Sequence, residues 1–232
     1  MKLIALDTAT EIVSVALRLD NDVKLDVETE RNRHSERLLP MVDALLTQAE
    51  LSVRDMDAIA FGAGPGAFTG LRTSCGVAQG LAWALDKPVV PVSNLMATAS
   101  AAQQKGVTGR VLVAIDARMN ECFVGVFDLT DGLPIVVSEP ELVKPETVAE
   151  LCLRFQPNAV VGTAVDAFGP ALGLPEDVRR DGTVRADAGD IARVAGDLFA
   201  AGHFTSAALA SPVYVRNRVA LTIEERARGE RL

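Results

Sequence analysis

The sequence predicts an α/β protein that contains the same folding unit twice, in two lobes with mixed sheets and flanking helices. Apolar strand patterns alternate with apolar helix patterns along the 232 residues, which is typical of layered α/β proteins. A hairpin pattern also occurs twice. The apolar run at residues 4–7 ends in Asp, and a similar run at residues 113–116 follows 109 positions later. We therefore expect an N-terminal lobe over residues 1–106 and a reduced C-terminal lobe over residues 107–232.

Each copy of the unit begins with two apolar strands joined by a short polar turn. With no gap in the alignment, residues 13–17 coincide with residues 122–126. Alternating apolar runs separated by a few polar residues are the pattern of a β-hairpin. The aligned segments are short, so chance similarity between two buried strands is the alternative to a duplication.

Five helices and three more strands are expected around these hairpins. Apolar residues at helical spacing predict helices, and short apolar runs between turn residues predict strands. The helices are expected at residues 35–50, 69–85, 93–104, 145–155 and 187–201. The strands are expected at residues 58–62, 89–92 and 159–162. The hairpin pattern restarts after residues 106–109, which places the boundary between the lobes there.

The composition indicates a cytoplasmic protein that does not hold RNA by itself. The net charge is −8, whereas phosphate contacts from basic side chains supply most of the affinity for nucleic acids. Asp7 and Glu11 interrupt the apolar run that a signal peptide needs, and no segment is long and apolar enough to span a bilayer. The three cysteines are far apart in the sequence, which favours buried thiols in a reducing compartment.

A glycine-rich segment at residues 61–72, FGAGPGAFTGLR, joins the strand at 58–62 to the next helix. Glycine lets a backbone approach another surface closely, and amides at a helix N-terminus bind anions. The spacing is neither that of a P-loop nor that of a Rossmann fingerprint, and a tight turn without a ligand is the alternative. The residues expected to build this loop are Gly64, Pro65, Gly66, Thr69, Gly70 and Arg72.

Two single residues, Arg72 in this segment and Tyr214 near the C-terminal end, add expectations. Arg72 lies in the first turn of the helix at 69–85, where a cation opposes the helix dipole. We therefore expect a carboxylate, a phosphate or a partner molecule close to it. Tyr214 is the only tyrosine of the chain, and we expect its hydroxyl to pin the C-terminal segment.

The two hairpin turns are the candidate nucleotide site. At the first turn, Thr8, Thr10 and backbone amides could bind phosphate, and Asp7 could orient a hydrated metal ion. The second turn contains Asp116 and Arg118 but no glycine. Its bulky side chains keep the backbone away from a phosphate, so we expect a degraded nucleotide site. Simple capping of the turns by the two aspartates is the alternative.

Catalytic and metal-binding residues are not expected. The chain has only His34 and His203, which are far apart, and no His-Glu-x-x-His motif. Cys75 lies within an apolar helix pattern, where a thiol is usually inert. A Gly-x-Ser-x-Gly elbow is absent too.

The helices at residues 35–50 and 69–85 are the candidate partner interface. Apolar residues cover more than one stripe of the first helix, among them Leu38, Val42 and Leu45. In the second helix, Gly76 and Gly80 lie on one face. Glycine in a helix interior costs about 1 kcal/mol relative to Ala, so two of them suggest a close helix approach. The neighbour is either the chain's own first helix or another subunit, and we favour a subunit.

Five segments together resemble the bacterial TsaB (YeaZ) family over residues 3–217. They are DTAT at residues 7–10, HSERLLP at 34–40, GAGPGAFTGLR at 62–72, AIDARMNE at 114–121 and SPVYVRN at 211–217. The resemblance implies the duplicated fold of actin, Hsp70 and the sugar kinases, in which the two hairpin turns face a cleft. It also implies pairing through the helical region named above.

The resemblance further implies a non-catalytic scaffold or dimerisation subunit. Such a subunit activates a TsaD-type catalytic subunit that forms N6-threonylcarbamoyladenosine at position 37 of tRNAs reading codons that begin with adenine. A TsaE-type ATPase would join the complex, tRNA would be held only through the complex, and the chain alone would form a homodimer. ATP or ADP with Mg²⁺ at the partner interface is the one cofactor expected.

Three other functions remain open on the sequence. A small-molecule kinase or ATPase of the same fold would require both hairpin turns to be competent for phosphate. A peptidase is less favoured, because neither metal-pair nor triad spacing is found. A general protein-binding module is the third alternative.

Overall fold

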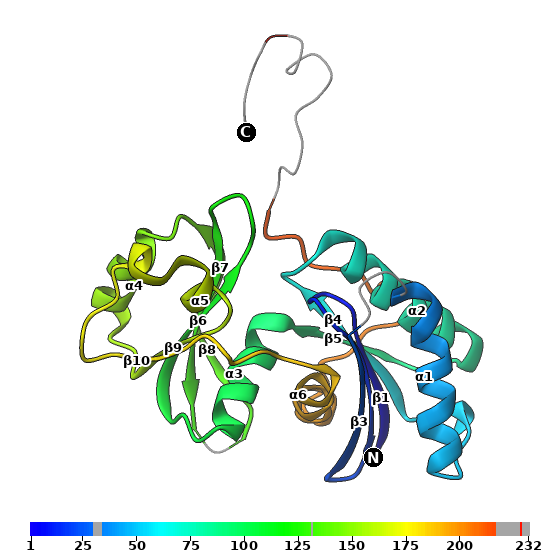
Figure 1. Ribbon diagram of the computed structural model, residues 1–232. Helices are drawn as coiled ribbons and strands as arrows, with labels where there is room; N and C mark the ends of the chain where they lie inside the picture. Colours follow the sequence, from blue (N-terminus) through cyan, green and yellow to red (C-terminus); the bar gives the residue numbers. More distant parts are fainter. Residues whose placement is uncertain (30–33, 131, 217–227, 229–232) are drawn as a thin grey trace.

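The computed structural model describes residues 1–29, 34–130, 132–216 and 228, and these residues form two five-stranded mixed sheets (Figure 1). The first sheet has the order β3-β2-β1-β4-β5. Its strands are β1 (Lys2–Asp7), β2 (Val13–Leu19), β3 (Asp22–Glu28), β4 (Ala58–Gly64) and β5 (Val89–Ser93). Strand β1 pairs antiparallel with β2 and parallel with β4.

The second sheet repeats this arrangement. Its order is β10-β9-β6-β7-β8, and β6 pairs antiparallel with β7 and parallel with β9. The strands are β6 (Gly109–Asp116), β7 (Cys122–Leu129), β8 (Ile135–Val143), β9 (Ala159–Val161) and β10 (Arg179–Asp181). Because strand order and direction agree in both sheets, the predicted duplicated α/β fold is confirmed.

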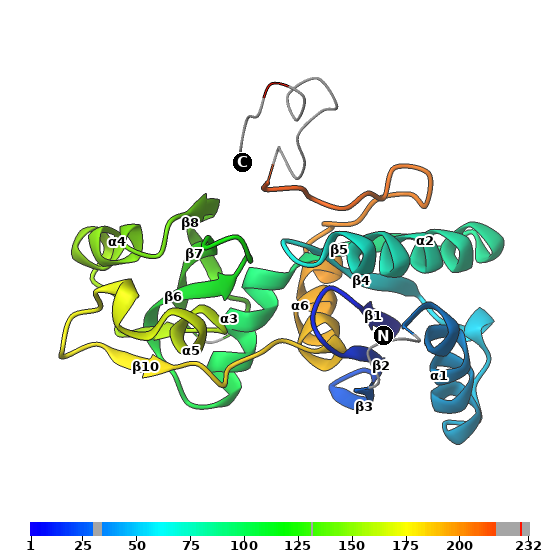
Figure 2. The same cartoon turned by 45° about the horizontal axis from the view of Figure 1, so that its top comes forward.

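Helices cover both faces of each sheet, and two of them lie between the sheets (Figures 1 and 2). Helices α1 (His34–Gln48) and α2 (Phe68–Leu85) pack on one face of the first sheet. Helices α4 (Thr147–Phe155) and α5 (Ala164–Phe168) pack on the outer face of the second sheet. Helices α3 (Asn94–Gln104) and α6 (Ala188–Ala200) fill the space between the sheets and pack against each other.

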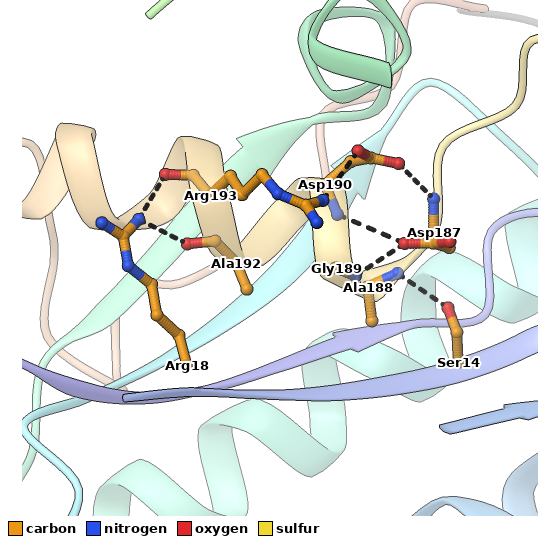
Figure 3. A network of polar contacts seen from close by, with 8 residues as sticks. All are labelled: Ser14, Arg18, Asp187, Ala188, Gly189, Asp190, Ala192 and Arg193. Atoms are coloured by element: carbon orange, nitrogen blue, oxygen red, sulfur yellow. Dashed lines mark hydrogen bonds and ion pairs between the residues drawn. The ribbon is translucent and has the colours of Figure 1, made fainter. Parts of the chain in front are cut away.

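Helix α6 follows the second sheet in the chain but packs on the first sheet. Figure 3 shows how it is held there. The amide of Ala188 donates a hydrogen bond of 2.9 Å to Ser14 Oγ, and Asp187 caps the helix. Arg18 Nη1 donates to the carbonyls of Ala192 and Arg193 at 3.1 and 2.7 Å. The division at residue 106 stays a prediction, and by packing α6 belongs to the first sheet.

The predicted elements are confirmed, with ends that differ by at most a few residues. All five expected helices and the expected strands are present. Six elements were given no range by the sequence: β3, β8, β10, α5 and the 3₁₀ turns η1 (Val53–Asp55) and η2 (Gly169–Leu172). Within the described ranges, no helix is long and apolar enough to cross a membrane.

Candidate functional site

The two hairpin turns face each other across a cleft of about 690 Å³ between the lobes. Thr10 and Glu11 of the β1–β2 turn line it from the first lobe, and Asp116 and Arg118 line it from the second. Most other lining residues are apolar, among them Ile12, Phe68, Leu71, Ile115, Phe123 and Val184. Of the residues predicted for the nucleotide site, Thr10, Asp116 and Arg118 are thus brought together, whereas Asp7 and Thr8 are buried and do not line the largely apolar cleft.

Asp7 lies beneath the first turn and not on the wall of the cleft. Its side chain is buried, and its Oδ1 accepts hydrogen bonds from Asn94 Nδ2 at 3.1 Å and from the Ala9 amide at 3.2 Å. Within the described residues, Oδ2 meets no donor. Burial raises the pKa of Asp7 to about 6. Asn94 Oδ1 in turn accepts from the amide of Gly64 at 2.8 Å, so Asp7 supports the glycine-rich loop.

The second turn is closed by Arg118. Arg118, Met119 and Asn120 all have positive φ, between 55° and 61°, which is unfavourable for residues other than glycine. The Asp116 carboxylate accepts from the Arg118 amide at 2.8 Å and from Nη1 at 3.2 Å. Nη2 of Arg118 lies 3.1 Å from Glu11 Oε1 across the cleft. Two of the chain's own carboxylates therefore pair with this exposed cation, which agrees with a degraded nucleotide site, although that remains a prediction.

The glycine-rich loop packs against the first hairpin turn. A Cβ at Gly70 would collide with the backbone carbonyl of Thr8. The Ala67 amide donates to the Ala9 carbonyl at 2.8 Å, and Thr8 Oγ1 donates to the Gly70 carbonyl at 2.6 Å. The close approach that the glycines predicted is therefore made to the chain's own β1–β2 turn. Gly64, with φ of 118°, also needs to be glycine.

Arg72 finds aromatic neighbours where the sequence suggested an anion or a partner. Its guanidinium carbon lies 3.8 Å from the ring centroid of Phe68, a cation–π contact. Its Nε donates to the hydroxyl of Tyr214 at 3.0 Å. The expectation that the Tyr214 hydroxyl pins the C-terminal segment is confirmed. Asn217, the last residue of the SPVYVRN segment, lies outside the described residues.

The predicted interface residues divide into two groups. Leu38, Val42 and Leu45 are buried in the core between α1 and the first sheet, so the prediction that they contact a partner is corrected. They are apolar because α1 packs on its own sheet. Gly76 and Gly80 are exposed on α2, and apart from their own stretch of helix no described atom lies within 4 Å of a Cβ built at either position.

Two large exposed apolar side chains on these two helices were missed. Trp83 of α2 is 72% exposed, and Leu39 of α1 is 51% exposed. Each follows a buried residue in the sequence: Trp83 comes directly after Ala82, and Leu39 comes directly after Leu38. Apolar residues at the solvent-facing positions of an amphipathic helix were the signal that could have found them.

The thiols and acids of the described part form no visible reaction centre. No group of three or more His, Cys, Asp or Glu residues there could hold a metal ion. Cys75, Cys122 and Cys152 are free and buried. Burial raises the pKa of Cys122 to about 12 and that of Cys152 to about 11, which leaves both thiols protonated and unreactive at neutral pH.

The chain is similar to several known proteins over most of its length. A family model described as "TsaD: tRNA N6-adenosine threonylcarbamoyltransferase" matches residues 28–227. The tRNA threonylcarbamoyladenosine biosynthesis protein TsaB of Escherichia coli K12 is 42% identical over 95% of this chain and 96% of its own. A crystal structure of YeaZ from Pseudomonas aeruginosa is 39% identical, has a TM-score of 0.82 and covers 92% of this chain and 99% of that one.

A second Pseudomonas aeruginosa structure, described as an uncharacterized protein with similarity to peptidase YEAZ, has a TM-score of 0.84 at 39% identity. It covers 93% of this chain and 99% of its own. Together with the repeated sheet order, the family match confirms the predicted fold class of actin, Hsp70 and the sugar kinases. Because the similarity to TsaB and to YeaZ extends over nearly the full length of this chain and of each relative, this chain belongs to the TsaB (YeaZ) family.

Proposed function

We propose that this chain is a non-catalytic scaffold subunit in the formation of N6-threonylcarbamoyladenosine at position 37 of tRNAs that read codons beginning with adenine. It binds a TsaD-type catalytic subunit through the exposed face of α2 and stabilises the active conformation of that subunit. The name of the Escherichia coli relative and the TsaD family match support the process. The open space over Gly76 and Gly80 is the observation that supports assigning the binding surface to this face of α2.

Nothing in the described part of this chain requires glycine on this face of α2. Each exposed helical glycine costs about 1 kcal/mol relative to Ala, and neither Gly76 nor Gly80 has positive φ or a close neighbour that would require it. Helix α1 of the same chain does not fill the space. Glycine on an open helix face allows the backbone of a second helix to approach closely. Trp83, one turn after Gly80 on the same helix, offers exposed apolar surface beside it. A helix of another subunit fits this surface.

The proposal extends to the wider assembly that the family resemblance implies. In the absence of its partner, the chain pairs with a second copy of itself through α2. A TsaE-type ATPase joins the complex, and tRNA binds only through the complex. ATP or ADP with Mg²⁺ binds at the partner interface. The net charge of −8 supports the proposal that tRNA binds only through the complex, because an acidic chain makes few favourable contacts with phosphate groups.

The test replaces Gly80 with Leu and measures complex formation with the host's TsaD-type subunit by light scattering on size-exclusion chromatography. A side chain at this position meets only open space, so the variant folds, and loss of the complex reports on the surface alone. Ala200→Leu, at the exposed end of α6, is the control and keeps the complex. Retention of a one-to-one complex by Gly80→Leu, together with normal tRNA modification in cells, would refute this surface.

A kinase or ATPase function is the second candidate, because a cleft of about 690 Å³ lies between the two hairpin turns. Glu11 and Asp116 already neutralise Arg118, the cation between the two turns. Calorimetric titration of the isolated chain with ATP and Mg²⁺ separates the two functions. Tight binding would favour the enzyme, and the scaffold function predicts no saturable binding by the chain alone.

A further inference from the structure

Residues 213–216, which we call the strap, run from the first lobe to the second (Figure 1, orange-red, beside α2). At the first-lobe end, the Val213 amide donates to the carbonyl of Ala63 at 2.7 Å. The ring of Tyr214 lies 5.3 Å from that of Phe68, and its hydroxyl accepts from Arg72. The strap is thereby fixed to β4 and to the first turn of α2.

Arg216 fixes the other end of the strap to the second lobe. Its Nη2 lies 2.6 Å from Glu121 Oε2 and 3.3 Å from the Arg118 carbonyl. The guanidinium carbon lies 5.9 Å from the ring centroid of Phe123. The Arg216 side chain is only 13% exposed, so water and salt screen this ion pair less than a surface pair.

All four residues of the strap line the cleft between the lobes. A second ion pair, between Arg118 and Glu11, also crosses the cleft, but its side chains are 72% and 51% exposed. Exposed pairs of this kind contribute little to stability. The contact between Arg216 and Glu121 is therefore the principal polar link between the strap and the second lobe.

We propose that the strap is a releasable wall of the cleft, and that separation of Arg216 from Glu121 opens it. Release requires one partly buried ion pair and its hydrogen bonds to break, whereas Val213 and Tyr214 keep the first-lobe end in place. The strap then swings on its first-lobe anchor and exposes the apolar wall formed by Phe123 and Val184. The device belongs to the chain itself and does not depend on a partner subunit.

A buried reporter thiol tests this proposal. Val184→Cys places a thiol of similar volume on the fully buried part of the cleft wall, and its rate of reaction with a maleimide measures opening. Adding Arg216→Ala is expected to raise this rate about tenfold, the effect of losing a charge-assisted hydrogen bond. Arg54→Ala, which removes an exposed arginine of the first lobe, leaves the rate unchanged.

Cys152 separates local opening from loss of the fold, since it is a buried residue of α4 in the core on the outer face of the second sheet, which includes no strap residue. Its labelling, followed by peptide mass spectrometry in the same samples, stays constant if only the strap is released. Glu121→Gln, which keeps the volume of the side chain and removes its charge, raises the reporter rate in the same direction. An unchanged reporter rate in both variants, or a parallel rise at Cys152, would overturn the proposal.

Discussion

Replacement of Asp7 by Asn should change how the stability of this protein depends on pH. The carboxyl of Asp7 is fully buried, and burial raises its pKa from 3.8 to about 6. The folded state therefore binds a proton more tightly than the unfolded state does. Between about pH 4 and pH 6 the folded protein holds more protons, so this group's contribution to stability falls as the pH rises.

The size of the effect follows from the two pKa values. The difference between 3.8 and about 6 corresponds to about 3 kcal/mol, since each pKa unit is worth about 1.4 kcal/mol. Asn cannot ionise, and its side-chain oxygen can still accept from Asn94 and the Ala9 amide. Relative to the wild type, Asp7→Asn should therefore gain stability as the pH rises from 4 to 7, by up to about 3 kcal/mol.

Urea unfolding at pH 4, 5, 6 and 7 measures this difference directly. Asp190 titrates in the same range, because burial raises its pKa to about 6, but it is present in both proteins and cancels in the comparison. Asp43→Asn, on the exposed face of α1, is the charge-matched control. A constant stability difference between Asp7→Asn and the wild type across these pH values would refute the reasoning.

Two matched pairs test the packing that positions the site. Gly70→Ala should destabilise the fold by about 1–3 kcal/mol, because its Cβ meets the Thr8 backbone. Gly76→Ala, in open space on the same helix, should instead stabilise the fold by about 1 kcal/mol. Thermal unfolding measures both variants, and equal effects on stability would contradict the assigned contacts. Leu38→Ala should cost about 2–5 kcal/mol as a cavity in the core, and the exposed Leu39→Ala should change stability by less than about 0.5 kcal/mol. A similar loss in both leucine variants, measured by urea unfolding, would mean that α1 is not oriented as described.

The fold was predictable because its pattern is local and repeated. The runs that end in Asp7 and Asp116 mark two hairpins, and strong helical spacing located α1 and α2. Strand β10 has the sequence Arg-Arg-Asp, so no apolar pattern could reveal it, and Pro140 interrupts the apolar pattern of β8. That α6 packs on the first sheet could not be predicted, because it depends on contacts such as those of Arg18 between residues far apart in the sequence.

The candidate site was predictable only in part, for physical reasons. Apolar spacing shows which face of α1 is buried but not whether a sheet or a partner covers it, so Leu38 was assigned to an interface when it belongs to the core. The glycine-rich loop revealed a close approach, yet only the structure shows that Gly70 meets Thr8. The link between Arg216 and Glu121 spans 95 positions, and no local pattern predicts it.

The central claim is that α2 presents its glycine face to another subunit. The most direct measurement is the molar mass of this chain mixed with its host's TsaD-type subunit, with Gly80 intact and with Gly80→Leu. The scaffold function predicts a stable one-to-one complex for the intact chain and separate subunits for the variant. Absence of a complex with the intact chain at micromolar concentration, or an undisturbed complex with Gly80→Leu, would contradict it.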